Sequence, residues 1–100
     1  MEKLKAHYPL ARVKALIQEG HYRITATAIR TAYEDFLLIS ESVVECVLNL
    51  DAGDLDKSMT TRFDHTLWQD VYHKAVGEKT AYIKLQILDN ETVIISFKEK

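Results

Sequence analysis

Features that stabilise or localise many small proteins are scarce in this sequence. Its 100 residues contain one cysteine, Cys46, so no disulfide can form within the chain. Cys46 lies in the apolar run VVECVLNL, and we expect its thiol to pack rather than react. The four histidines and this cysteine lack the spacing of a zinc site, so we expect neither a metal ion nor another cofactor.

Long apolar stretches and sequence repeats are also missing. No run is long enough to span a bilayer, and the start of the chain has no apolar segment of the kind that directs secretion. We therefore expect a cytoplasmic protein without a membrane partner. With 47% hydrophobic residues and no linker or low-complexity segment, the sequence predicts a single domain over residues 1–100.

The sequence lacks the excess of positive charge that marks many nucleic-acid-binding proteins, because its formal net charge is −2. The charge is uneven. Residues 1–56 hold 6 Lys or Arg against 9 Asp or Glu, whereas residues 57–100 hold 7 against 6. Any contact with RNA would therefore depend on local groups in the second half, and less on long-range steering.

Proline and glycine are also scarce, and one of each marks an end of a predicted helix. The single proline, Pro9, begins a first helix, and Gly20 ends it in a left-handed conformation. The apolar stripe of this helix consists of Leu10, Val13, Leu16 and Ile17. A short strand over residues 21–24 can follow, and Thr25 or Thr27 then caps a second helix.

The next predicted elements are a third helix and a sheet. Ser42 and Glu45 form the pattern of a capping box, and the helix that they begin runs to about Leu50. Beyond it the apolar period changes to two, which predicts strands over residues 55–61, 67–73, 80–88 and 92–98. The sequence thus predicts an α+β fold, with helices in about residues 1–52 packed on one face of an antiparallel sheet in about residues 54–100.

The last two predicted strands have one apolar and one largely polar face. Ile83, Leu85 and Ile87 alternate with Tyr82, Lys84 and Gln86, and Val93, Ile95 and Phe97 alternate with Ile94, Ser96 and Lys98. A tight turn at Asp89-Asn90 would pair these strands. Tyr82, Lys84 and Lys98 would then share the face opposite the core. Solubility of a strand edge is the alternative use of the two lysines.

Polar groups suited to chemistry crowd into residues 57–72, KSMTTRFDHTLWQDVY. This stretch resembles the signature of the MqsR family of bacterial toxins, and the final VIISFKEK is similar to the end of that family's sequences. The resemblance implies a RelE-like fold and an endoribonuclease of a type II toxin–antitoxin system. It further implies cleavage of mRNA at GCU-like sites without a metal. The implied partner is a cognate antitoxin that neutralises the toxin, binds DNA and regulates the operon as a complex with it.

The resemblance also implies the catalytic residues, which are Lys57, Gln69, Tyr82 and Lys98. Cleavage by attack of the 2′-hydroxyl needs a base, cationic donors for the phosphorane and an acid for the leaving 5′ oxygen. The residue pattern alone supports only the pairing of Tyr82 with Lys98, and it does not fix the face of Lys57 or Gln69. Which residue is base and which is acid stays open. A lysine base would need a pKa lowered by nearby cations, and a cation beside Tyr82 would favour its phenolate.

Further residues are expected to contact RNA, namely Arg62, His65, Trp68, Tyr72 and Lys84. We expect His65 to orient the substrate with Asp64 or Asp70 as its partner, although an imidazole could also transfer protons. Trp68 and Tyr72 could stack on bases, with packing as the alternative for Trp68. A non-catalytic RNA-binding module of the same fold is the alternative interpretation of the whole chain.

Overall fold

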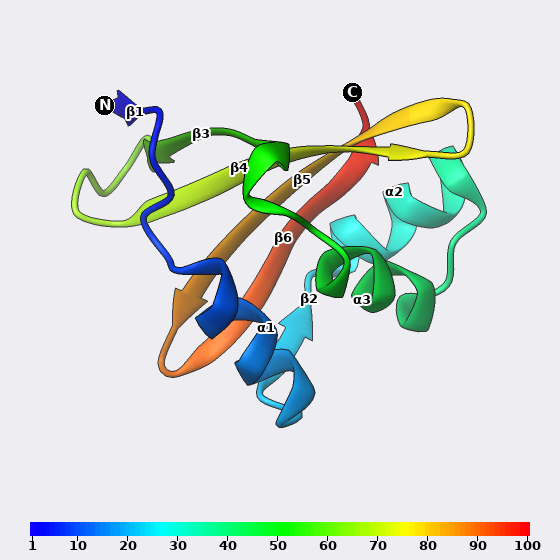
Figure 1. Cartoon of the computed structure of the whole chain (residues 1–100), viewed down its shortest axis with the longest axis horizontal. Coiled ribbons are helices and arrows are strands. Elements are labelled where there is room, and N and C mark those ends of the chain that lie inside the picture. Colours follow the sequence, from blue (N-terminus) through cyan, green and yellow to red (C-terminus); the bar gives the residue numbers. More distant parts are fainter.

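Three helices and a six-stranded sheet form the structure, which confirms the predicted α+β class. The computed structural model describes residues 1–100 (Figure 1). The helices are α1 (Leu10–Gln18), α2 (Ala26–Phe36) and α3 (Ser40–Leu48), followed by the 3₁₀ turn η1 (Ala52–Asp54). The strands are β1 (Glu2–Lys3), β2 (Tyr22–Ile24), β3 (Leu55–Thr60), β4 (Trp68–Val76), β5 (Lys79–Leu88) and β6 (Glu91–Glu99). None of the helices has the length and apolar character needed to cross a membrane.

The starts of the first two helices follow the sequence signals. Pro9 precedes α1, and its carbonyl accepts the backbone N–H of Val13 at 3.1 Å. The hydroxyl of Thr25 accepts the N–H of Ala28 at 3.1 Å, so Thr25 caps α2 and Thr27 does not. The predicted short strand after α1 is present as β2.

The predicted capping box at Ser42 is wrong. Helix α3 begins at Ser40, so Ser42 lies within its first turn. Leu37 ends α2 in a left-handed conformation with a φ of 58°, and this sharp turn lets the chain enter α3 earlier than predicted. A capping box occurs instead at η1, where the N–H of Asp51 donates to the carboxylate of Asp54 at 2.8 Å.

The sheet is built around three long antiparallel strands joined by tight turns. Its order is β1-β3-β4-β5-β6-β2, and only β2 with β6 is parallel. Gly77 turns β4 into β5 with a φ of 62°. Asp89 and Asn90 have φ values of 54° and 59° and turn β5 into β6, which confirms the predicted hairpin. The two-residue strand β1 was not predicted, and it adds the start of the chain to the edge of β3.

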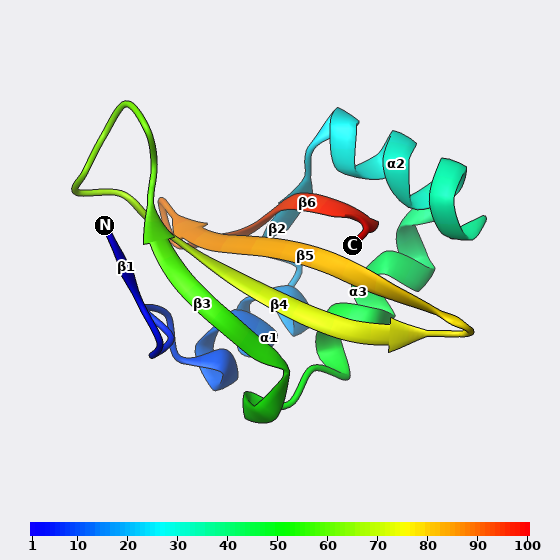
Figure 2. The same cartoon turned by 90° about the horizontal axis from the view of Figure 1, so that it is seen from above.

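One face of the sheet carries the hydrophobic core. Helices α1 and α3 lie against this face, and α2 runs along the β6 edge (Figure 2). The edge contact is polar, because the hydroxyls of Thr25 and Thr31 donate to carbonyls of β6 at 2.8 and 2.6 Å. Buried core residues include Val13, Ile17, Ala28, Val43, Val47, Tyr72, Ile83, Leu85, Ile94 and Phe97. We call the opposite sheet face, which no helix covers, the open face.

A β-bulge in β6 changes the predicted alternation. This strand has one more residue than the stretch of β5 with which it pairs, and Ile95 is the unpaired one. Ile94 therefore faces the core and is fully buried. The prediction that Val93 and Ile95 share the core face with Phe97 is wrong. The bulge shifts the alternation in the structure, and the pattern of apolar residues in the sequence does not reveal it. After the bulge Lys98 still lies opposite its predicted partner.

Replacement of Thr25 by alanine should lower the free energy of unfolding by about 1–2 kcal/mol, because it removes both the cap of α2 and the hydrogen bond to β6. Thr27→Ala is the matched control, since Thr27 is exposed, and it should change this energy by less than about 0.5 kcal/mol. Chemical denaturation of both variants measures the difference. Equal losses in the two variants would contradict the assignment of Thr25 as the cap.

Candidate active site

The open face carries cationic and hydrogen-bonding side chains from four neighbouring strands. They are Lys57 of β3, Gln69 and His73 of β4, Tyr82, Lys84 and Gln86 of β5, and Ser96 and Lys98 of β6. Paired residues on neighbouring strands point to the same side of a sheet, so the register brings the four expected catalytic residues to one face. No three His, Cys, Asp or Glu side chains gather anywhere in the structure to hold a metal ion.

Lys57 is held by the first strand of the chain. Strand β1 pairs with β3 through Glu2 opposite Met59 and Lys3 opposite Ser58. This pairing brings Glu2 Oε2 to 3.0 Å from Lys57 Nζ. The hydrogen bond that Lys57 donates to the Glu2 carboxylate raises the pKa of Lys57. Lys57 is therefore an ammonium group at neutral pH, which suits contact with phosphate and not service as a base.

Tyr82 lies in the middle of the cluster, with cations beside its ring. The Nζ atoms of Lys98 and Lys84 lie 5.2 and 5.9 Å from the ring centre. Burial nevertheless raises the pKa of the Tyr82 phenol, and attraction to Lys57 offsets only part of this effect. The expectation that a nearby cation makes this phenol ionise more easily is wrong, because lost hydration outweighs the charge. At neutral pH Tyr82 is thus a donor of a proton or a hydrogen bond.

Lys84 and Gln69 complete the polar surface around Tyr82. Burial, followed by repulsion from Lys98, lowers the pKa of Lys84. Gln69 Nε2 donates to Gln86 Oε1 at 3.3 Å, which links the amides of β4 and β5 across the open face. An amide cannot move a proton at neutral pH, so Gln69 is suited to orienting a phosphate or a base.

Arg62 and His65 lie in the exposed loop that joins β3 to β4. Asp64 organises this loop, because its Oδ1 accepts the N–H and the hydroxyl of Thr66 at 2.8 and 2.5 Å. The carboxylate of Asp70 accepts backbone N–H groups of the N-terminal segment instead. The structure shows no hydrogen bond from His65 to Asp64 or Asp70. The hydrogen bonds from Thr66, followed by the charge of His65, lower the pKa of Asp64.

Trp68 and Tyr72 point away from the open face. The ring of Trp68 stacks on His7 with 5.4 Å between ring centres, and Lys3 Nζ lies 4.1 Å from the centre of the Trp68 ring. Trp68 therefore has the packing role that was the alternative to stacking on a base. Tyr72 is 1% exposed, and burial raises its pKa to about 12. The expectation that Tyr72 stacks on an RNA base is wrong, since its ring is enclosed in the core.

His73 also belongs to the open face, and the sequence reasoning missed it. The period of two that starts at Gln69 reaches His73 after four residues, so the alternation of β4 contained the signal. The ring centre of His73 lies 6.0 Å from that of Tyr82, and its Nε2 lies 3.8 Å from Asp56 Oδ2. The open face therefore carries an imidazole in addition to the expected residues.

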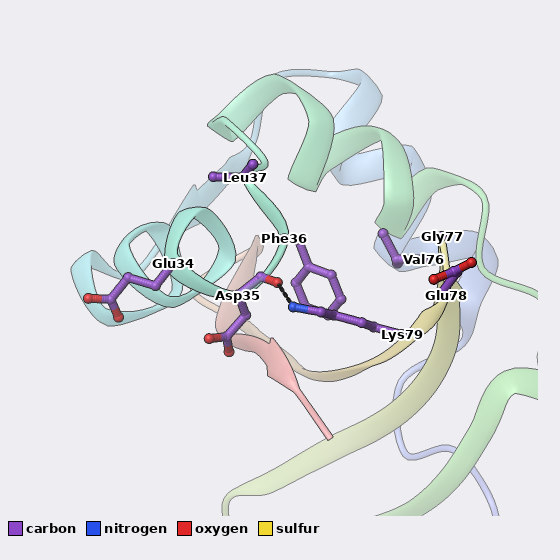
Figure 3. Close-up of a pocket in the computed structure, with 8 residues that line it drawn as sticks. All are labelled: Glu34, Asp35, Phe36, Leu37, Val76, Gly77, Glu78 and Lys79. Carbon is purple, nitrogen blue, oxygen red and sulfur yellow. Dashed lines mark hydrogen bonds between the residues drawn. The ribbon is translucent and has the colours of Figure 1, made fainter.

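A separate cleft of about 580 Å³ lies between the end of α2 and the turn that joins β4 to β5 (Figure 3). Its lining consists of Glu34, Asp35, Phe36, Leu37, Val76, Gly77, Glu78 and Lys79. Three of these side chains are carboxylates, and Lys79 Nζ donates to the Asp35 carbonyl at 2.6 Å. Carboxylates thus outnumber the single cation, Lys79, on this surface, whereas the open face carries three lysines, so the open face is the better candidate for a polyanion.

A family model described as "Motility quorum-sensing regulator, toxin of MqsA" matches residues 5–99. The chain belongs to the MqsR toxin family. A relative named mRNA interferase toxin MqsR, from Escherichia coli (strain K12), is 37% identical over 100 residues, and the match covers 100% of both chains. The resemblance first seen in the KSMTT signature and the SFKEK end is thus confirmed along the whole chain.

Lys84 should lose its proton at a lower pH than Lys57, because burial lowers the pKa of Lys84 and Glu2 raises that of Lys57. NMR titration of ¹³C-methylated lysines measures both midpoints. Lys98→Ala should move the Lys84 midpoint up, and Glu2→Gln should move the Lys57 midpoint down. The reverse order of the two lysines in the unsubstituted protein would contradict this electrostatic description of the face.

Proposed function

We propose that this protein is a toxin endoribonuclease that cleaves mRNA at GCU-like sites on its open face without a metal ion. Membership of the MqsR toxin family and the relative named as an mRNA interferase support the activity. The observation that carries the proposal is the gathering of three lysines, a glutamine and a protonated phenol on one uncovered sheet face. A polyanion undergoing cleavage needs this combination of cations and proton donors.

The cleavage that we propose begins with the RNA itself. The 2′-hydroxyl attacks the adjacent phosphorus, so the nucleophile is part of the substrate. Lys57 and Lys98 stabilise the negative charge that develops on the phosphorane. Tyr82, whose raised pKa keeps it a phenol, donates to the leaving 5′ oxygen. Gln69 orients the phosphate or a neighbouring base through its amide.

The partner that we propose is a cognate antitoxin that neutralises the toxin in the cytoplasm. The family description calls its members toxins of a named partner, MqsA, which supports this pairing. The finer expectations, that the antitoxin binds DNA and that the complex regulates its own operon, are part of the same proposal.

The purified protein should cut a defined RNA with a single GCU site in the presence of EDTA. The expected products carry a 2′,3′-cyclic phosphate and a 5′-hydroxyl, because the 2′ oxygen attacks the phosphorus. Mapping of both ends by mass spectrometry identifies them. Binding of the RNA without cleavage would favour the non-catalytic module, and products with a 5′-phosphate would contradict the proposed chemistry.

Tyr82→Phe tests the role of the phenol in this assay, since the variant retains the ring and loses only the hydroxyl. It should lower the cleavage rate by about one to three orders of magnitude, the range typical of losing an acid or a transition-state hydrogen bond. RNA affinity should change much less, because the lysines remain. An unchanged rate would remove the hydroxyl from the mechanism and leave the ring as a packing element.

A further inference from the structure

His73 occupies a central position on the open face that the proposed mechanism does not yet use. It lies directly opposite Tyr82 in the pairing of β4 with β5, with 6.0 Å between the ring centres. Its side chain is 24% exposed, so the imidazole is accessible but partly shielded. On the other side, its Nε2 lies 3.8 Å from Asp56 Oδ2. His73 therefore stands between a carboxylate and a phenol.

A β-bulge brings Asp56 to this position. In a regular strand Asp56 and Lys57 would point to opposite faces of the sheet. The register between β3 and β4 shifts between Leu55 and Lys57, and Asp56 is left without a partner on β4. Bulges change the direction of a side chain in this way, and they are common beside active sites. As a result Asp56 approaches His73 although Lys57 keeps its place on the open face.

The other titratable groups around His73 are poor proton acceptors near neutral pH. Those that face it are Asp56 and Lys57 from β3, Tyr82 and Lys84 from β5, and Lys98 from β6. Lysines and tyrosines ordinarily hold their protons at neutral pH, and carboxylates ordinarily lack one and are weak bases. Imidazole is the side chain whose ordinary titration range spans neutral pH.

We propose that His73 is a further catalytic residue, the base that takes the proton of the attacking 2′-hydroxyl. This inference rests on the proposed function. The O–H bond of the 2′-hydroxyl breaks and its proton passes to the imidazole, while the O2′–P bond forms. The P–O5′ bond then breaks, and Tyr82 supplies a proton to the 5′ oxygen. Exchange with water returns His73 and Tyr82 to their starting states, so no further reactant is needed.

Asp56 has a positioning role in this step. With Nε2 of His73 facing Asp56, Nδ1 is the nitrogen available to the substrate. The carboxylate stabilises the imidazolium as it forms, as an acidic partner does beside other catalytic histidines. At 3.8 Å the pair is within ion-pair distance and longer than a hydrogen bond.

Single-turnover cleavage of the same RNA, measured against pH, tests the proposal. General-base catalysis gives a rate that rises with pH as the base loses its proton, so the wild-type rate should show one such limb. His73→Gln should lower the neutral rate by about 10²- to 10⁴-fold and abolish this limb. In His73→Ala, added imidazole should restore part of the rate, which a purely structural histidine would not allow. Asp56→Asn should lower the rate and Asp56→Glu should retain most of it, because the carboxylate positions the imidazole and stabilises the charge that develops on it.

His21→Gln is the matched control, since His21 is exposed and has no assigned role in binding or cleavage. It should keep the wild-type rate and pH profile. Wild-type cleavage with an unchanged limb in His73→Gln would overturn the role of His73 and leave the proposed function intact. Absence of cleavage by the wild-type protein would overturn both. If the His73 variants fail to fold, Asp56→Asn decides, and a wild-type rate in that variant overturns the proposal.

Discussion

The pairing register of β4, β5 and β6 is the constraint on which the open face depends. A slip of one residue would carry Tyr82 and His73 to the helix side and expose core residues in exchange. Two turns hold the register, and both require left-handed backbone: Gly77 joins β4 to β5, and Asp89 with Asn90 joins β5 to β6. The core reinforces it, because Ile83 and Phe97 are fully buried only in this pairing. The position of the proposed chemistry is thus a consequence of the hairpins and of the apolar packing beneath them.

The N-terminal segment adds the second element on which the face depends. The carboxylate of Asp70 is 1% exposed and accepts the N–H groups of His7 and Tyr8 at 3.0 and 2.9 Å. A buried carboxylate with such partners is satisfied without a cation. This contact holds the segment beside β4, so that β1 reaches β3 and Glu2 reaches Lys57. The ion-pair partner of a proposed catalytic lysine is therefore supplied by a strand of two residues at the edge of the sheet.

Much of the fold was predictable because its signals are local. The alternation of β5 and the turn at Asp89-Asn90 predicted the hairpin that pairs Tyr82 with Lys98, and Pro9 predicted the start of α1. The capping box at Ser42 was not reliable, because the preceding turn decides where α3 begins. Strand β1 carries too few residues to show any period.

The site was less predictable, because its geometry depends on contacts between distant residues. Trp68 and Tyr72 looked available to RNA, yet β4 has large apolar side chains on its helix side and the N-terminal segment covers Trp68. The pKa of Tyr82 follows burial, which the sequence does not display. The contact of Asp56 with His73 needs a bulge, and one extra residue in a strand leaves no trace in composition.

The proposed function requires that RNA binds and reacts on the open face. The most direct measurement is an NMR titration of the protein with an RNA that has one GCU site. In this RNA hydrogen replaces the attacking 2′-hydroxyl, so that the RNA binds without being cleaved. The largest changes in NMR chemical shift are expected at residues of the open face, namely Lys57, Gln69, His73, Tyr82 and Lys98. Changes confined to the cleft at residues 34–37 and 76–79, with the open face unaffected, would contradict this requirement.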